Sequence, residues 1–499
     1  MKTPMHSRWA GRILAVAMAC ACASASFAAE PVKTIRLLDE VRAQWATAQP
    51  ARIFTARKIL TGDPSHPEAT AVAVGGGLVL ALGSLESVTA SLGDFPYDID
   101  GRFEGKVIVP GFIDANADPV FAAIAFGSEV IAADDWKIPG RGARVARTPE
   151  QYLERIREAA AEPAARNETL FTWGYDARSH GALGREALDK ASPQRAVVVW
   201  SRTGDALILN SAAIDKYAVS GDIPSDARFT GVAQETALRF IGRDLFSPRQ
   251  FARGLHALRE WLPAHGITTL AQRGALPRFA PQAVIHEALD DPLTTFRTYF
   301  IADGTAIFRE ATVAEENVLL RTQRFWTYGR GRVEWPLQQV ALLAGNAADF
   351  DKAFRLYWRA EYQLHIRAGT VAESELALRI LRARQAADPR PQHRTTVALP
   401  ADAPPAIADE LGRLGAVVSA RVQGIPERPL AASKGLASIT STPAHAIQRE
   451  NYIGSIKAGS YADFAILESE PPAGVTLPVD HLGIWGTVLG GRPQPAARK

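Results

Sequence analysis

Cysteine is almost absent from this sequence. The two cysteines among 499 residues, Cys20 and Cys22, both lie near the N-terminus. Removal of that segment leaves a chain without disulfides, without a thiol nucleophile and without a cysteine-based zinc site. Charge of one sign is also lacking, since 56 basic residues face 53 acidic ones. This balance gives no reason to expect binding to nucleic acid or to an anionic membrane surface.

Long apolar runs are missing as well. Residues 13–23 form an apolar stretch that is too short for a stable transmembrane helix, and no later segment is long enough. Arginines precede this stretch and small residues follow it as far as Ala28, which is typical of a secretory signal peptide. We therefore predict a signal peptide over residues 1–28 and a periplasmic or secreted mature protein. A lipid anchor on Cys20 or Cys22 is disfavoured, because no leucine stands at the expected position before either.

Both ends of the mature chain carry strand patterns. Residues 51–60 and 71–83 are rich in apolar residues, and three glycines at 75–77 predict a hairpin turn within the second stretch. Three further strand patterns occupy residues 107–113, 462–467 and 484–489. The termini therefore predict all-β segments on either side of a different central region.

Helix and strand patterns alternate through the centre. Helix patterns cover residues 149–161, 248–265, 347–368 (at least its first half) and 372–387. Strand patterns cover residues 196–200, 267–270, 295–301, 338–343, 363–366, 395–399 and 416–420. Alternation of this kind over roughly 300 residues favours a barrel of parallel strands surrounded by helices.

Several phrases resemble one known family. Residues 109–118 read Val-Pro-Gly-Phe-Ile-Asp-Ala-Asn-Ala-Asp, and residues 266–269 read Gly-Ile-Thr-Thr. The most specific phrase is the run from Ile453 to Phe464, which ends in Gly-Ser-Tyr-Ala-Asp-Phe. Together these phrases resemble the amidohydrolase 3 branch of the amidohydrolase superfamily, the group that includes N-substituted formamide deformylases.

The resemblance implies an α/β fold, a (β/α)8 TIM-like barrel with a small β-sandwich built from both termini. The implied boundaries are 1–28 for the signal peptide, 29–108 and 446–499 for the sandwich, and 109–445 for the barrel. It also implies an active site at the carboxyl ends of the barrel strands, where members bind one or two divalent metals. Such a metal lowers the pKa of a bound water and polarises the substrate carbonyl.

The metal ligands of the family are substituted in this chain. The family's first strand carries His-x-His, where this sequence has Asn116 and Asp118. Its third-strand phrase Ser-Gly-His is replaced by residues 203–205, Thr-Gly-Asp, and this puts Asp205 on the histidine position. Asp118 can ligate a metal, whereas an asparagine is a poor zinc ligand.

The later ligand positions are altered too. Alignment from Gln363 puts Arg367 on a histidine position, although a shifted alignment would let His365 serve instead. The next strand ends in Leu399 rather than histidine. Between Leu399 and Pro443 the chain is too short for two strand-plus-crossover units, so we predict that the eighth strand is lost or reduced. Glu235 is retained in the Gly-x-x-x-Glu phrase of the family, at residues 231–235.

These substitutions lead to a main hypothesis. An ion pair replaces the metal: Arg367 projects into the barrel mouth, surrounded by Asp118, Asp205 and Glu235, because a buried arginine demands carboxylate partners. The protein is then a non-hydrolytic homologue with no cofactor, which binds a small-molecule ligand or has a regulatory role. Asp118, Asp205 and Arg367 are the candidate catalytic groups if chemistry persists, and Asn116 would join the ligand-binding set. The oligomeric state is left open.

Two alternatives remain. The chain is a hydrolase of non-peptide carbon–nitrogen bonds whose rearranged site holds one divalent metal, zinc or manganese, on the four residues Asp118, Asp205, Glu235 and His365. An oxygen-rich set of this kind suits manganese better than zinc. The other alternative is a metal-free acid–base enzyme that uses two carboxylates of unlike pKa, with Asp118 and Asp205 as the pair.

Overall fold

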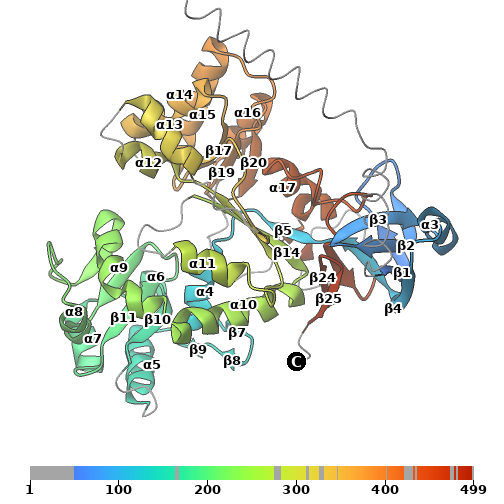
Figure 1. The fold of residues 1–499 in the computed structure, drawn as a ribbon. Helices are drawn as coiled ribbons and strands as arrows, with labels where there is room; N and C mark the ends of the chain where they lie inside the picture. The colour runs from blue at the N-terminus through green and yellow to red at the C-terminus, as the bar shows by residue number, and fades with distance from the viewer. Residues whose placement is uncertain are drawn as a thin grey trace, which may run out of the picture. The chain divides into compact units, whose positions relative to one another are not determined.

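The computed structural model of the protein describes most of the chain (Figure 1). The described residues are 50–162, 168–274, 282–310, 314–324, 331–345, 347–400, 402–420, 431–432, 435–471, 477–478 and 482–496. The predicted signal peptide, with Cys20 and Cys22, lies outside these ranges. Within them, no helix combines the length and the apolar character needed to cross a bilayer.

Strands from both ends of the chain form one sheet of seven strands, in the order β25-β24-β22-β4-β1-β2-β3. Their bounds are β1 Ala51–Leu60, β2 Glu68–Gly75, β3 Leu78–Gly83, β4 Tyr97–Pro110, β22 Phe464–Leu467, β24 Ile484–Leu489 and β25 Arg492–Pro495. Strand β22 pairs antiparallel with β4 and so joins the two ends of the sequence. Gly76 and Gly77 turn between β2 and β3 at positive φ, 60° and 84°, which explains the predicted hairpin. The described strands form a single sheet, so the sandwich is not confirmed.

A second sheet follows the start of the central region. It contains β6 Glu129–Ala132, β9 Arg144–Val145, β10 Leu170–Tyr175, β11 Val197–Ser201, β12 Ala206–Leu209 and β13 Arg228–Thr230, in the order β13-β12-β11-β10-β6-β9. Strands β6, β10 and β11 run parallel, whereas β12 returns antiparallel to β11. The accompanying helices are α5 Pro149–Ala161, α6 Ala177–His180, α7 Arg185–Ala191, α8 Ser211–Tyr217 and α9 Gly231–Leu245. A short hairpin pairs β7 Lys137–Ile138 with β8 Arg141–Gly142.

Two further sheets have four parallel strands each. One has the order β16-β15-β14-β5 and the other β17-β18-β19-β20. Their bounds are β5 Phe112–Asp114, β14 Ile267–Arg273, β15 Arg297–Ile301, β16 Val333–Glu334, β17 Gln339–Leu343, β18 Gln363–Arg367, β19 Thr396–Leu399 and β20 Val417–Ala420. A parallel bridge between Asp303 and Ala341 connects the first of these sheets to the second. Across the described residues these strands do not close into an eight-stranded barrel.

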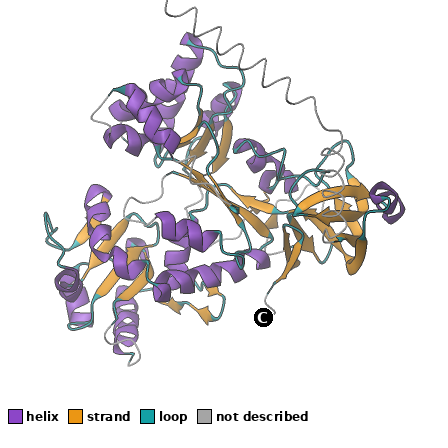
Figure 2. Ribbon diagram, in the orientation of Figure 1, coloured by secondary structure: helices purple, strands orange, loops and turns teal. Residues whose placement is uncertain are grey.

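Helices connect the parallel strands, as Figures 1 and 2 show. They are α10 Arg253–Ala264, α11 Gln282–Leu289, α12 Gly304–Glu310, α13 Glu315–Arg324, α14 Ala347–Arg359, α15 Val371–Ala387 and α16 Pro405–Arg413. The C-terminal part adds a 3-10 turn at Leu436–Ile439, α17 Ser441–Ala446, and a short pairing of β21 Ala431–Ala432 with β23 Leu477–Pro478. Most of the segment predicted to have lost the eighth strand, 421–430 and 433–434, lies outside the described residues.

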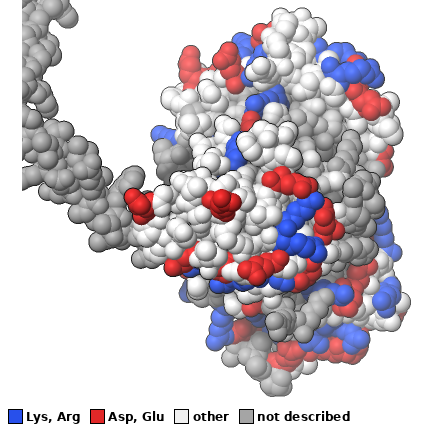
Figure 3. Space-filling view, turned by 90° about the vertical axis from the view of Figure 1, so that its right-hand side faces the viewer, with Lys and Arg blue, Asp and Glu red and all other residues white. Residues whose placement is uncertain are grey.

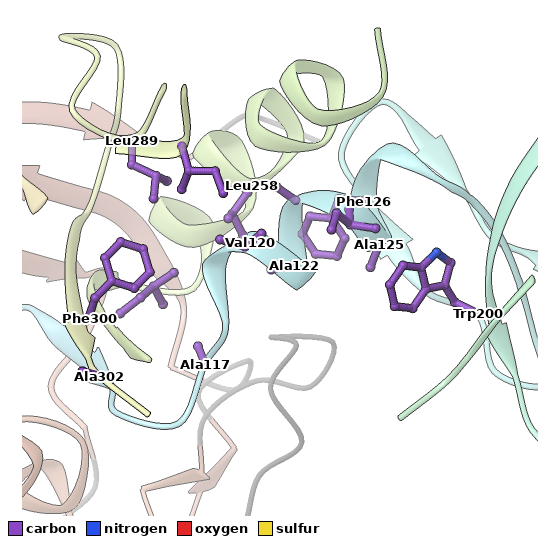
Figure 4. Packing of buried hydrophobic residues seen from close by; sticks show 14 of the residues in the cluster. Ala117, Val120, Ala122, Ala125, Phe126, Trp200, Leu258, Leu289, Phe300 and Ala302 are labelled. Carbon is purple, nitrogen blue, oxygen red and sulfur yellow. The ribbon is translucent and has the colours of Figure 1, made fainter. Parts of the chain in front are cut away.

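Helix α4, Pro119–Gly127, lies in the core directly after the first family motif. It is apolar on all sides, which predicts a helix enclosed by other elements, and all its residues except Phe121 are buried. Figure 4 shows Val120, Ala122 and Phe126 packed close to Leu258 of α10. Gly254 permits this contact, because a Cβ atom there would lie 1.7 Å from the carbonyl oxygen of Ala123. The start of α4 is therefore held firmly.

Candidate functional site

Asp118 starts helix α4 just after strand β5. Its Oδ1 accepts hydrogen bonds from the backbone N–H groups of Val120 at 3.0 Å and Phe121 at 2.9 Å. This is the usual action of an N-cap aspartate, and proline at the first helical position favours the same start. Its Oδ2 accepts from Nε2 of Gln272, near the end of β14, at 2.8 Å. The side chain remains partly exposed.

Charged residues gather at the carboxyl ends of the parallel strands. We call five of them the strand-end cluster: Asp114, Asp118, Arg273, Asp303 and Arg367. Arg273 ends β14 and Arg367 ends β18. Nη1 of Arg367 donates to the backbone oxygen of Arg273 at 3.2 Å, so the ends of the two strands are in contact. Parallel strands with loops at this end are the usual support for an active site in such folds.

Burial and neighbouring charges shift the pKa values of this cluster. Burial raises the pKa of Asp118 to about 7, although the backbone N–H of Phe121 and the charge of Arg367 act in the opposite direction. Burial also raises the pKa of Asp303, again against the charge of Arg367. Burial raises the pKa of Asp114, which accepts a hydrogen bond from the backbone N–H of Asn116 at 2.9 Å. These carboxylates hold protons more readily than usual.

Arg273 is the most buried cation of the cluster, with 5% of its surface exposed. Burial lowers its pKa to about 10; the nearby charge of Asp114 raises this pKa and that of Arg367 lowers it further. Arg273 therefore stays protonated at neutral pH. Arg367 is only partly buried. The cluster thus presents one enclosed cation, one accessible cation and an accessible carboxylate that titrates near neutrality.

Asp205 and Glu235 lie outside this cluster. Asp205 occupies the turn between the antiparallel strands β11 and β12, where its Oδ1 accepts from Ser201 Oγ at 2.7 Å and from Thr203. Glu235 is exposed on α9. Asp118 and Asp303 are the acids whose pKa the charge of Arg367 lowers. The expectation that Asp205 and Glu235 also surround Arg367 remains a prediction.

His365 is fully buried in the middle of β18. Its Nε2 lies 3.0 Å from Oε1 of Gln339 and its Nδ1 lies 2.8 Å from Oγ1 of Thr396. Burial holds its pKa well below the ordinary value, with a smaller contribution from Arg273, so the ring is neutral. Both ring nitrogens have hydrogen-bond partners, so neither is available for a metal.

The described residues do not fit a divalent metal. Across the ranges that the structure describes, no group of three or more His, Cys, Asp or Glu side chains could hold one. Asp118 caps α4 and accepts a hydrogen bond from Gln272, both ring nitrogens of His365 have hydrogen-bond partners, and Asp205 accepts from Ser201. The proposed set of four ligands for zinc or manganese is therefore not assembled in the described part of the chain.

Part of this chain, from α11 to the last strand, matches a known protein family. Residues 283–494 match the amidohydrolase family. This match confirms the family resemblance over the later strands, including β18 with Arg367. A search of curated proteins finds no match.

Solved structures show the same fold. An uncharacterized metal-dependent hydrolase from Pyrococcus horikoshii has a TM-score of 0.58 and 11% identity, covering 87% of this chain and 99% of that one. An uncharacterized metal-dependent hydrolase from Pyrococcus furiosus has a TM-score of 0.56 and 12% identity, covering 84% of this chain and 99% of the other. At this level of identity the likeness concerns the fold alone. The fold is therefore a mixed α/β fold similar to that of amidohydrolases.

Sequence reasoning found Asp118 and Arg367 but missed Gln272, Arg273 and Asp303. Gln272 and Arg273 are the last two residues of β14, the strand that begins within the family phrase at 266–269. A glutamine and an arginine at the carboxyl end of this strand were a usable signal, because functional residues of such folds lie at that end. Asp303 follows the strand pattern at 295–301 by two residues and gave a comparable signal.

Proposed function

We propose that this protein is a hydrolase of non-peptide carbon–nitrogen bonds with a rearranged site, in which Asp118 and Arg367 act on the substrate. The amidohydrolase match and two fold neighbours described as metal-dependent hydrolases support the reaction class. The observation that carries the proposal is Asp118: a partly exposed carboxylate at a strand end, with a pKa of about 7 and a cationic neighbour.

Asp118 has the capacity to act as a general base. A carboxylate has about four positions that accept hydrogen bonds. Three are used, by Val120, Phe121 and Gln272. The remaining one can accept a proton from a water molecule that attacks the substrate carbonyl carbon. A base with a pKa near the working pH is the most effective for this step.

Arg367 supplies the electrostatic stabilisation of the transition state. As the C–O bond to water forms, negative charge develops on the carbonyl oxygen, and the guanidinium stabilises this oxyanion by hydrogen bonds. Protonated Asp118 then returns its proton to the leaving nitrogen, and the C–N bond breaks. The products are a carboxylic acid and an amine, and no step requires a metal, in keeping with the unsuitable set of donors.

A second candidate is the non-hydrolytic homologue expected from the substituted ligands. The observation that favours it is that His365 is fully engaged by Gln339 and Thr396, so the family's catalytic apparatus is absent from that strand. In this case the strand-end cluster would bind a small ligand without turnover.

Hydrolysis by the purified mature protein decides between the candidates. Release of amine from a panel of formamides and N-acyl compounds is measured with chelator, and separately with added zinc or manganese. We expect turnover that survives the chelator and is lost in Asp118→Asn. Asp205→Asn is the matched control, since Asp205 lies in a hairpin turn, and should keep activity. Turnover that requires added metal, or that Asp205→Asn abolishes, contradicts the proposed site. Complete absence of turnover favours the second candidate.

A further inference from the structure

A cavity of about 490 Å³ lies at the amino ends of strands β10 and β11. It is lined by Leu170, the first residue of β10, by Arg195, just before β11, and by Arg253, the first residue of α10. None of the five described residues of the strand-end cluster lines it. Its volume lies within the range of about 300–1,000 Å³ that is usual for small-molecule sites. The cavity is therefore a second candidate site, separate from the one that carries the proposed function.

Most of the charged side chains around the cavity are paired with an opposite charge. The pairs are Lys216–Asp244, Arg249–Glu168, Arg144–Glu129 and Arg144–Glu162. Arg195 and Arg253 differ from these residues, because neither forms an ion pair within the described part of the chain. The acids that line the cavity thus have other cations as their close partners, and two guanidinium groups are left without one.

Arg253 lies beside a second arginine at the end of helix α4. Its Nη2 donates to the carbonyl oxygen of Gly127 and to Oε1 of Gln250, the latter at 3.2 Å. Nη2 of Arg141 donates to the carbonyl oxygens on either side, those of residues 126 and 128. Two guanidinium groups therefore meet at consecutive carbonyls, where the helix dipole favours a positive charge. Nε and Nη1 of Arg253 donate to no described residue.

Arg195 is held in a similar way on the other side of the cavity. Its Nε donates to the carbonyl oxygen of Glu168 at 2.9 Å, and its Nη1 donates to that of Ala159 at 2.7 Å. These bonds fix the guanidinium without neutralising it, because a carbonyl oxygen carries no net charge. Nη2 of Arg195 donates to no described residue. Both arginines therefore keep N–H groups that a ligand in the cavity can use.

Glu129 is an acid that several of these arginines share. Its Oε1 accepts from Nε of Arg144 at 2.7 Å, and its Oε2 lies 3.8 Å from Nη1 of Arg141. Burial lowers the pKa of Arg195 and of Arg253, and the charge of Glu129 opposes the shift in each. One carboxylate thus faces four arginines. An anion in the cavity would offset the positive charge that remains.

The placement of the two arginines selects the kind of anion. Arg195 and Arg253 come from different elements, so the ligand must offer oxygens that point in more than one direction. A phosphate group has tetrahedrally arranged oxygens and matches guanidinium groups through paired hydrogen bonds, whereas the two oxygens of a carboxylate lie in one plane. We propose that this cavity binds a small phosphate ester, whose phosphate group accepts hydrogen bonds from Arg195 and Arg253. The cavity also has room for the organic part of such an ester.

Calorimetric titration of the mature protein tests this site, with inorganic phosphate, glycerol 3-phosphate and acetate as probes at one ionic strength. We expect both phosphates to bind at least tenfold more tightly than acetate. Arg195→Lys and Arg253→Lys keep the charge and lose the planar donor group. Each should weaken phosphate binding about tenfold or more, the ratio typical of a lost hydrogen bond to a charged group. The unfolding midpoint of each variant is measured alongside, and the ranking of the three probes on wild type does not depend on either variant.

Arg249→Lys is the matched control. Arg249 lines the same cavity, but it is paired with Glu168. The same substitution there should leave phosphate binding within about twofold of wild type, since the proposed hydrogen bonds come from the other two arginines. If Arg249→Lys weakens binding as much as Arg253→Lys, the protein attracts phosphate only through its general charge, and the inference fails.

The remaining outcomes are equally decisive. Acetate that binds as tightly as phosphate overturns the choice of a phosphate group. No measurable binding of either phosphate at millimolar concentration overturns the site itself. The test measures binding and not turnover, so its result does not depend on the proposed hydrolysis.

Discussion

Asp118 should make the stability of this protein depend on pH in an unusual direction. Its pKa rises from an ordinary 3.8 to about 7 on folding. Between these two values the folded state keeps a proton that the unfolded state has released. The stability contributed by the neutral carboxyl is therefore fully present below pH 3.8 and is lost as the pH rises through about 7.

The size of this effect follows from the difference between the two pKa values. It corresponds to roughly 4 kcal/mol of unfolding free energy over the whole range, and about 2–3 kcal/mol of it falls between pH 5 and pH 8. Asp118→Asn carries no such titration. An asparagine can also cap α4, so the variant should keep its helix start.

Chemical denaturation at pH 5 and pH 8 measures the effect. The unfolding free energy of Asp118→Asn, relative to wild type, should be about 2–3 kcal/mol higher at pH 8 than at pH 5. Burial also raises the pKa of Asp114 and Asp303, but both are present in the two proteins and cancel in the comparison. A difference that does not change with pH would refute the burial argument and, with it, the general base near neutrality.

Four further outcomes are expected. In the hydrolysis assay, kcat/KM should rise with pH to a plateau with a midpoint near pH 7, and Asp118→Asn should lower it by about 10²–10⁴-fold; a flat profile would exclude this base. Gly254→Ala places a Cβ atom 1.7 Å from the oxygen of Ala123 and should cost about 1–3 kcal/mol or more in thermal denaturation, whereas an unchanged midpoint would show that α4 and α10 do not pack as described. Arg297→Gln breaks a buried pair with Asp463, whose Nε–Oδ2 distance is 2.5 Å, and should cost about 3–5 kcal/mol; a loss below 1 kcal/mol would be inconsistent with that pair. Zinc or manganese should leave the unfolding midpoint unchanged, and a concentration-dependent rise would reveal a metal site.

Much of the fold could be predicted from local patterns. The strand expected at 267–270 is the start of β14, and the one at 196–200 is shifted by one residue from β11. Strands from both terminal segments share one sheet of seven strands, whereas the expected sandwich is not confirmed. These predictions succeed because periodicity and turn residues act within a few positions along the chain.

The assignment of strands to sheets could not be predicted in the same way. The family phrase at 203–205 suggested a barrel strand, but this turn joins β11 to an antiparallel β12. Only residues 202–205 separate the two strands, which is too short for a parallel crossover. The shortness of the turn at 202–205 can be read from the sequence. The grouping of β6, β10 and β11 in one sheet depends on long-range packing, and this grouping fixes the place of the turn that contains Asp205.

The residues of the candidate site fall into two groups: those that a sequence motif marks and those that no motif marks. Asp118 and Arg367 could be found because a motif marks their positions. Arg273 and Asp303 have no motif, and their importance comes from how β14, β15 and β18 bring their ends together. Burial, which gives Asp118 its unusual pKa, is likewise a property of the folded chain.

The surface carries its charges intermixed. On the face in Figure 3, acidic and basic side chains alternate over short distances and do not gather by sign. This agrees with the balanced composition. The expectation of a small-molecule ligand rather than nucleic acid remains a prediction.

The helix cap at Asp118 limits how this site can change. Restoring the family's His-x-His motif would require histidine at 116 and at 118, yet the side chain at 118 accepts the first N–H groups of α4. Replacing that cap costs about 1 kcal/mol, and a histidine there must also find room at the start of an enclosed helix. A substitution at position 118 therefore changes the start of α4 as well as the candidate site, so the chemistry of this residue and the stability of the helix cannot be altered separately.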